Sequence, residues 1–313
     1  MRIYRIDHVA QVTPDLDGQV SLLRNVFGFR PTSRWDNPEQ GVKGVRLAVP
    51  GSWGQDWVVL APSGENSPLQ STLDEQKGRP GFHHVGAEVP DLDAVRAELD
   101  KRGLSYVDSG HGWIETSLTP PEHGPGVRFR LRGIGSLALA GDENAVPVSD
   151  SDVSEVDGPA VGIVTMDHIC QAYPDREALA QWYADLAGFL PIWKTPIDEL
   201  PDMADLVLNI PGSSVCWEII MPRGEDSFID RFLAKNGTAV HHITFQVADW
   251  DAARAALAQH GIEPFDDEEG VTDGAAWKHT FVHPKQTGGV LVQLFWEEKP
   301  GVWVRSDKIP VDA

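Results

Sequence analysis

The sequence predicts an α+β fold in which four copies of one small βαβββ unit form two tandem domains. Two observations predict it. A histidine-to-acid signature occurs four times at constant spacing, and the two halves of the chain repeat one another at long range. With 313 residues, 41% of them hydrophobic, each half is long enough to bury a core of its own.

Each copy of the signature starts at a histidine on a short alternating strand; the four histidines are His8, His84, His168 and His242. At the same distance from each histidine stands an aspartate: Asp15, Asp91, Asp175 and Asp249. Acidic residues favour a helix start, because the first turn has unpaired N–H groups and the positive end of the dipole. A glycine is expected to close each helix: Gly28, Gly103, Gly188 and Gly261. Strand-like segments follow, for example residues 44–49 and 205–210.

The two halves match in register over a long distance. His8 and His168 are 160 positions apart, and so are Pro62 and Pro222. Residues 141–158 are rich in Asp, Glu, Ser and Pro and lack periodicity, which is typical of a linker. We therefore expect a domain over residues 1–141, an acidic linker over 142–160 and a second domain over 161–313.

Composition excludes several classes of partner. The chain has 47 acidic and 26 basic residues, a formal net charge of −21, which argues against nucleic acid and against anionic lipid. No apolar run approaches the length of about 20 residues that spans a membrane. The N-terminus lacks the apolar core of a signal peptide, and the two cysteines form no CxxC motif. These features predict a cytoplasmic protein and leave a homodimer open.

Four side chains of the C-terminal half suggest a metal site. If two units pair face to face, their first strands lie side by side, and His168 and His242 converge in the cleft between the sheets. Glu218 stands in the last strand of the third unit, where an unpaired carboxylate is costly to bury. Gln293 is the lone polar residue in the last apolar strand of the fourth unit. Each residue alone would fit an ordinary core role, but their equivalent places in a repeat favour a divalent ion with open positions.

The N-terminal half keeps both histidines but loses the other two positions. The expected equivalents of the carboxylate and amide ligands are Val58 and Arg130. A cation and an apolar residue make a poor divalent site, so this half is predicted to be a degenerate, structural copy. The alternative is a second metal site that uses Glu115 or Glu122.

These residues carry a family resemblance. The runs 6–9 and 166–169, the His-His pairs 83–84 and 241–242, and the tail 283–293 resemble the vicinal-oxygen-chelate (glyoxalase-like) superfamily, with local similarity to methylmalonyl-CoA epimerase. The resemblance implies one divalent metal (Fe, Mn, Co, Ni or Zn) on His168, Glu218, His242 and Gln293. The ligand is the second histidine of each pair. Four units in one chain also resemble the type I extradiol dioxygenases, which implies Fe(II) held by two histidines and one glutamate. The glutamate of that family matches Gln293, so a triad here would use Glu218 instead.

The sequence departs from the epimerase pattern at the acid-base positions. The epimerase has Gln in the third unit and Glu in the fourth, whereas here they are exchanged, and the amide of Gln293 cannot move a proton. The family's other acid-base Glu falls near Leu206. The neighbouring Asp205 is expected to face the opposite side of the strand.

Three side chains are therefore candidates for the catalytic base: Glu218, His279 and His283. Aromatic side chains expected to line a substrate pocket, or else to pack in the core, are Trp217, Trp277 and Phe295. The first functional hypothesis is a metal-dependent lyase or isomerase that chelates two vicinal oxygens of a small substrate and stabilises an enolate. The alternatives are an Fe(II) ring-cleavage dioxygenase and a non-catalytic small-molecule binding or resistance protein.

Overall fold

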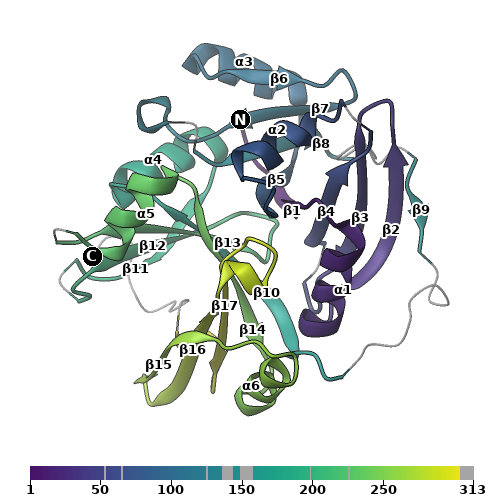
Figure 1. Cartoon of the computed structure of the whole chain (residues 1–313). Coiled ribbons are helices and arrows are strands. Elements are labelled where there is room, and N and C mark those ends of the chain that lie inside the picture. The colour runs from purple at the N-terminus through teal and green to yellow at the C-terminus, as the bar shows by residue number, and fades with distance from the viewer. Residues whose placement is uncertain are drawn as a thin grey trace.

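The computed structural model describes residues 1–52, 54–64, 66–124, 126–135, 144–148, 158–197, 199–224 and 226–303, and its strands form two curled sheets, one in each half (Figure 1). The N-terminal sheet has the order β6-β7-β8-β5-β1-β4-β3-β2-β9, with β1 (Arg5–Val12), β2 (Arg30–Asn37), β3 (Val42–Ala48), β4 (Asp56–Pro62), β5 (Gly81–Val89), β6 (Tyr106–Asp108), β7 (Trp113–Ser117), β8 (Arg128–Gly133) and β9 (Val146–Pro147). The C-terminal sheet has the order β11-β12-β13-β10-β14-β17-β16-β15, with β10 (Ile163–Ala172), β11 (Leu190–Lys194), β12 (Met203–Asn209), β13 (Cys216–Pro222), β14 (Val240–Val247), β15 (Phe265–Thr272), β16 (Ala275–Val282) and β17 (Val292–Glu297). The predicted α+β fold of four units in two tandem domains is confirmed.

Four of the described α-helices begin at the predicted aspartates, and the other two begin at Ser67 and Ser227. The described α-helices are α1 (Leu16–Phe27), α2 (Pro68–Glu75), α3 (Leu92–Arg102), α4 (Arg176–Ala187), α5 (Phe228–Asn236) and α6 (Trp250–Gln259). The side chains that accept N–H groups of the first turns of α1, α3, α4 and α6 are Asp15, Asp91, Asp175 and Asp249. Three of the four glycines cap their helices in the left-handed conformation: Gly28, Gly103 and Gly188. In α6 the cap is His260, and Gly261 follows it with φ of 68°.

The units of each half join edge to edge. In the C-terminal half β10 pairs antiparallel with β14 and parallel with β13, so that His168 lies opposite Thr244 and Cys170 lies opposite His242. β1, β4 and β5 repeat this arrangement in the N-terminal half. The first strands of the two units lie side by side, as expected, but the units form one continuous curled sheet instead of two sheets that face each other across a cleft. The first strands pair their open backbone groups with each other, which makes one continuous sheet whose single face carries both histidines.

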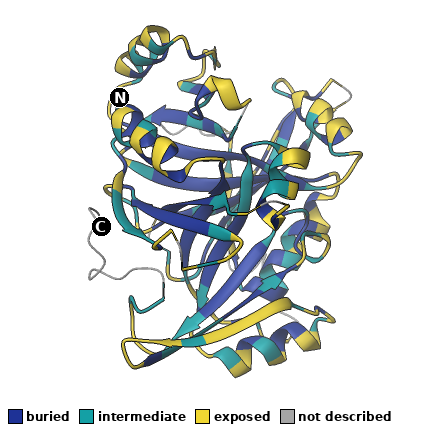
Figure 2. Cartoon of the chain, turned by 90° about the vertical axis from the view of Figure 1, so that its left-hand side faces the viewer, coloured by how far each residue is buried: buried dark blue, intermediate teal, exposed yellow. Residues whose placement is uncertain are grey.

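The opposite face of each sheet packs on helices and on the other sheet, forming the core shared by the two halves (Figure 2). Trp217 lies in this core, with its ring 5.3 Å from that of Phe129 and its indole N–H donated to Gln171 over 3.1 Å. Trp217 therefore points away from the face that carries Glu218, because neighbouring strand residues alternate between faces. The expectation that Trp217 lines a substrate pocket is corrected accordingly.

Part of the predicted linker belongs to the N-terminal sheet. β9 pairs antiparallel with β2 through Ser33 and Arg34. Residues 142–143 and 149–157 of the linker lie outside the described residues, and so do residues 304–313 of the second domain. No helix in the described part of the chain is long and apolar enough to cross a membrane.

Candidate metal centre

Three buried side chains from three adjacent strands converge on one point of the C-terminal sheet. The Oε2 atom of Glu218 on β13 lies 3.4 Å from Nε2 of His168 on β10 and 3.5 Å from Nε2 of His242 on β14. The ligand atoms of these residues all lie within 4.8 Å of one another. Two imidazole nitrogens and one carboxylate are a facial donor set for a first-row divalent metal.

Both rings are held in the orientation that a metal ligand needs. Nδ1 of His168 is 2.8 Å from Asp167, and Nδ1 of His242 is 2.9 Å from Nδ1 of His241. These contacts leave the Nε2 atoms directed at Glu218. Nε2 of His242 is buried and has no hydrogen-bond partner among the described residues. A buried, unpaired ring nitrogen beside a carboxylate, with the other nitrogen fixed from behind, fits a divalent metal.

Gln293 reaches this cluster through Thr244, which the sequence analysis did not single out. The Thr244 hydroxyl is 2.8 Å from Nε2 of His168 and donates to Oε1 of Gln293 over 2.8 Å. Thr244 is two residues beyond His242 on β14, so the alternation of the strand places both on the same face. That alternation is the signal that would have found it.

The cluster balances its charges. Burial opposes ionisation of Glu218, but the neighbouring His168 outweighs it and lowers the pKa of the Glu218 carboxyl to about 2. Burial likewise opposes a charge on His168, but Glu218 and Asp167 raise its pKa to about 9. Burial keeps the pKa of His242 well below its usual range. The cluster without metal is therefore an ion pair of Glu218 with His168, next to a neutral His242.

Asp205 also faces the cluster, which corrects its expected orientation. On β12 Val207 lies opposite Glu218, and Asp205 lies opposite Ile220. Residues two apart on a strand share a face, so Asp205 is on the Glu218 side, while Leu206 packs in the core. Burial, followed by the charge of Glu218, raises the pKa of Asp205 to about 7.

Aromatic side chains form a wall beside the cluster. His279 stacks on Trp277 at 5.8 Å, and the ring of Trp303 lies 5.3 Å from His279, 4.6 Å from Phe295 and 6.3 Å from His168. The Glu297 carboxylate accepts N–H groups of residues 301–303 and so holds Trp303 against the site. Trp303 follows the last strand and has no counterpart in the repeat, so nothing in the repeat pattern predicts its position.

The two predicted base histidines lie in different places. Nε2 of His279 is 3.3 Å from the Glu268 carboxylate, and its Nδ1 is buried without a hydrogen-bond partner in the described part of the chain. Burial lowers the pKa of His279. His283 is exposed and accepts the Lys285 N–H at the start of a 3₁₀ turn. The structure does not bring His283 to the cluster.

The N-terminal half fills the equivalent positions differently. Val58 pairs with Ala10 on β1, just as Glu218 pairs with Cys170 on β10. Arg130 pairs with Gly86 on β5, just as Gln293 pairs with Thr244 on β14. This register confirms the two equivalences expected from the sequence. A side-chain carbon at Gly86 would overlap the His8 ring, so the small residue gives that ring its space.

The N-terminal histidines satisfy each other in one hydrogen-bonded chain. Arg128 Nη1 is 3.1 Å from Nε2 of His83, whose Nδ1 is 2.6 Å from Nδ1 of His84. Nε2 of His84 is 3.1 Å from Nε2 of His8, and Nδ1 of His8 is 2.7 Å from Asp7. If Arg128 is the first donor, each neutral imidazole accepts one hydrogen bond and donates one, and the last is accepted by the Asp7 carboxylate. No ring nitrogen of this chain is left over for a metal.

The two acids of the alternative N-terminal site lie elsewhere. Glu115 is 2.7 Å from Arg130 and 3.5 Å from Arg128, and Glu122 is exposed. Among the described residues, two groups of three side chains are close enough to hold a metal, and both lie in the C-terminal half. They are His168, Glu218 and His242, and the overlapping set Cys170, His241 and His242.

The neutral histidine chain predicts acid sensitivity. Burial lowers the pKa of His83 and His84 well below 6.5, so below that pH the unfolded state binds protons that the folded state does not. Stability should therefore fall as pH drops below 6.5, by up to about 1.4 kcal/mol per pH unit for each such ring. Urea unfolding of chelator-treated protein between pH 7 and 5 measures how the free energy of unfolding depends on pH. His84→Gln should reduce the slope of that dependence by the equivalent of about one bound proton. An unchanged slope in His84→Gln would contradict neutral burial of this ring.

The fold and the site together define a tandem protein of the vicinal-oxygen-chelate class. Residues 7–114 and 167–282 match the family model of the Glyoxalase/Bleomycin resistance protein/Dioxygenase superfamily. The chain belongs to this superfamily.

Several relatives are epimerases. The chain is 33% identical over 108 residues to ethylmalonyl-CoA/methylmalonyl-CoA epimerase of Cereibacter sphaeroides, covering 34% of this chain and 78% of that one. It is 33% identical over 144 residues to the mitochondrial methylmalonyl-CoA epimerase of Homo sapiens, covering 45% and 79%. A mutant of 4-hydroxymandelate synthase from Streptomyces coelicolor shares the fold over 99% of this chain and 97% of that one, with a TM-score of 0.70 and 14% identity.

Proposed function

We propose that the C-terminal half is a divalent-metal-dependent lyase or isomerase centre for a small organic substrate with two adjacent oxygens. The observation that carries the proposal is the convergence of His168, Glu218 and His242, with the buried Nε2 of His242 unpaired among the described residues. Gln293 supplies a fourth oxygen, next to His168 across the Thr244 hydroxyl. The similarity to epimerases, which are isomerases, supports the same reaction class.

A divalent ion bound here would act as a Lewis acid toward the substrate oxygens and stabilise the negative charge of an enolate. Removal of the proton falls to the protein, and His279 is the best placed of the predicted bases. Glu268 fixes its Nε2, and the unpaired Nδ1 is free to accept a proton. Its lowered pKa keeps the ring neutral near pH 7, as a general base requires.

The surroundings suit a substrate that is partly apolar. Trp277 and Trp303 lie around His279, Phe295 packs on Trp303, and the side chains of the cluster are buried. Exclusion of water strengthens the electrostatic interactions inside a site. Asp205 has a pKa of about 7, which also fits acid–base chemistry. It lies on the same face as Glu218, on the neighbouring strand β12.

Proton exchange tests this function directly. Metal-loaded protein is incubated in deuterated water with 2-oxo acids, 2-hydroxy ketones and acyl thioesters that carry a second carboxylate. Proton NMR then follows the C–H beside the carbonyl. We expect metal-dependent deuterium incorporation into at least one class, abolished by chelation. No exchange in any class would argue against enolate chemistry.

A dioxygenase remains the second candidate because two histidines and one glutamate form the facial set used for non-haem Fe(II). An oxygen electrode with Fe(II)-loaded protein and catechols or hydroquinones separates the two functions. Oxygen uptake without proton exchange would support the dioxygenase and overturn the lyase or isomerase.

A further inference from the structure

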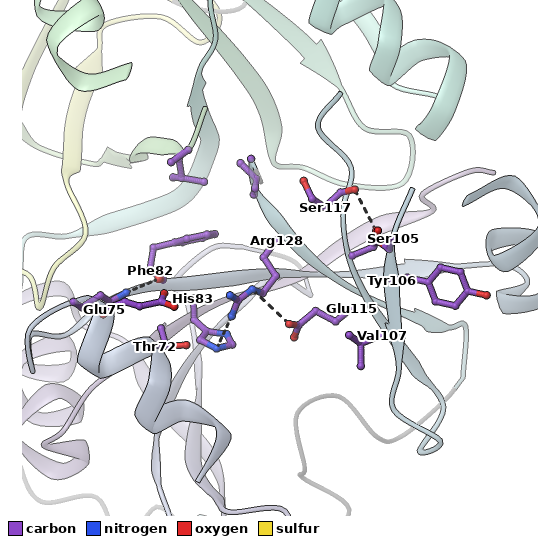
Figure 3. A pocket seen from close by; sticks show the side chains of 16 residues that line it. Thr72, Glu75, Phe82, His83, Ser105, Tyr106, Val107, Glu115, Ser117 and Arg128 are labelled. Carbon is purple, nitrogen blue, oxygen red and sulfur yellow. Dashed lines mark hydrogen bonds and ion pairs between the residues drawn. The ribbon is translucent and has the colours of Figure 1, made fainter. Parts of the chain in front are cut away.

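A cavity of about 510 Å³ lies at the boundary between the two halves, outside the metal centre (Figure 3). The N-terminal half supplies most of its wall, including His83, Arg128 and Glu115. Ala239 and Val240, where β14 begins, line it from the C-terminal half. None of the four proposed metal ligands lines it. Its volume is in the range of small-molecule sites, about 300–1,000 Å³, which often form at domain boundaries.

Two guanidiniums converge on one carboxylate at the Arg128 side of this cavity; Arg128 lines the cavity, and Arg130 lies outside the lining. Arg128 and Arg130 share one carboxylate, that of Glu115, at 3.5 and 2.7 Å. His83 adds no charge, because burial keeps the pKa of its imidazole well below the usual range. Glu75 is the other carboxylate of the lining, and it is exposed on α2. Beside Glu115 there are therefore two guanidinium charges for one negative charge.

These guanidiniums keep unused donors. Arg128 contacts Glu115 through Nε and His83 through Nη1, while Arg130 contacts Glu115 through Nε and stacks over Trp113 at 4.4 Å. Within the described ranges, Nη2 of Arg128 and both Nη atoms of Arg130 have no hydrogen-bond partner. The Arg128 side chain is 40% exposed and lines the cavity, and the Arg130 side chain behind it is 11% exposed. Guanidinium groups with spare N–H donors match a carboxylate.

The rest of the lining is largely apolar. Phe82 lies beside His83 on the cavity wall (Figure 3). Val127, which precedes Arg128 in the sequence, also lines the cavity. Val240 and Ala239 face them from the C-terminal half. A ligand that satisfies both parts of the wall has an anionic head and an apolar body.

We propose that this cavity is a second ligand site, which binds a small organic carboxylate with Arg128 as the anchor and Phe82, Val127 and Val240 against its apolar part. The proposal is independent of the metal chemistry. Carboxylates also bind metal ions, so its test must keep the two sites apart.

Isothermal titration calorimetry with phenylacetate and hexanoate, on metal-loaded and on chelator-treated protein, provides the test. We expect one equivalent of carboxylate to bind in both states, and the matching amides, phenylacetamide and hexanamide, to bind at least about tenfold more weakly. Arg128→Gln should weaken carboxylate binding by about ten- to a hundredfold. The control Arg96→Gln removes an exposed guanidinium on α3, outside the cavity, and should change nothing.

Near-ultraviolet circular dichroism and the unfolding temperature verify that Arg128→Gln is folded. Three outcomes would overturn the proposal: no binding of either carboxylate at millimolar concentration, equal affinity for acid and amide, or unchanged affinity in folded Arg128→Gln. Binding that disappears on chelation would place the ligand on the metal and would also overturn it. Loss of the metal in Glu218→Ala should leave carboxylate binding unchanged. Each of the two proposals can therefore be disproved without the other.

Discussion

Glu218→Ala is expected to abolish high-affinity metal binding, with a loss of affinity greater than about 100-fold, and with it all metal-dependent activity. Removal of an outer contact to a metal ligand already costs about 10- to 100-fold, and Glu218 is the one carboxylate of the ligand set. The remaining side chains would be two imidazoles and one amide, without the negative charge that compensates a dication. Titration with Co(II), followed by visible absorbance and calorimetry, measures the change.

Glu122→Ala is the matched control, because Glu122 is exposed in the N-terminal half and belongs to the alternative site weighed from the sequence. It should bind metal as the unmodified chain does. Loss of metal in Glu122→Ala, or retention in Glu218→Ala, would move the metal centre out of the C-terminal cluster. Circular dichroism separates loss of a ligand from loss of the fold, since Glu218 is buried.

His279→Gln is expected to lower kcat by about 10²- to 10⁴-fold while metal content stays the same. Glutamine retains polarity and similar bulk but cannot take up a proton. His279 lies outside the metal cluster, and it contacts the aromatic wall and Glu268 instead. Deuterium exchange at the substrate carbon, with metal measured in the same samples, separates a lost base from a lost ion.

Glu268→Gln tests how His279 is oriented. Glu268 is 61% exposed, so its loss should disturb neither fold nor metal, and the expected decrease in kcat is about tenfold. A residue with only a structural role in β15 would leave kcat unchanged. If His279→Gln keeps full activity, Asp205 becomes the first alternative base, since it faces the cluster with a pKa of about 7.

The sequence predicted those parts of the fold and site that repeat. The spacing from His168 to Asp175 recurs in every unit, and it located the strand that carries each histidine and the helix that follows. The same repeat paired Val58 with Glu218 and Arg130 with Gln293, and the strand register confirms both pairs. Periodic patterns are local, so they can be recognised in the sequence without knowledge of the tertiary structure.

The rest depended on contacts between distant segments. The side-by-side placement of β10 and β14 was expected from the repeat, but the joining of the two units into one continuous sheet was not. Trp217 is an aromatic residue of the kind that often lines pockets, but it lies on the core side of β13. Asp205 lies on the side of β12 that faces the site. A shift of one residue along a strand reverses its faces, so an error of one position exchanged Asp205 and Leu206. Trp303 lies outside every repeat and reaches the site through Glu297.

The central claim is one metal centre, in the C-terminal half. The most direct measurement is metal content by inductively coupled plasma mass spectrometry, on protein purified without an affinity tag and after reconstitution with Fe, Mn, Co, Ni or Zn. The structure predicts about one divalent ion per chain. It predicts none in Glu218→Ala, because the N-terminal imidazoles are already hydrogen-bonded to each other. No bound metal after reconstitution would contradict the claim, and two ions per chain would contradict the single centre.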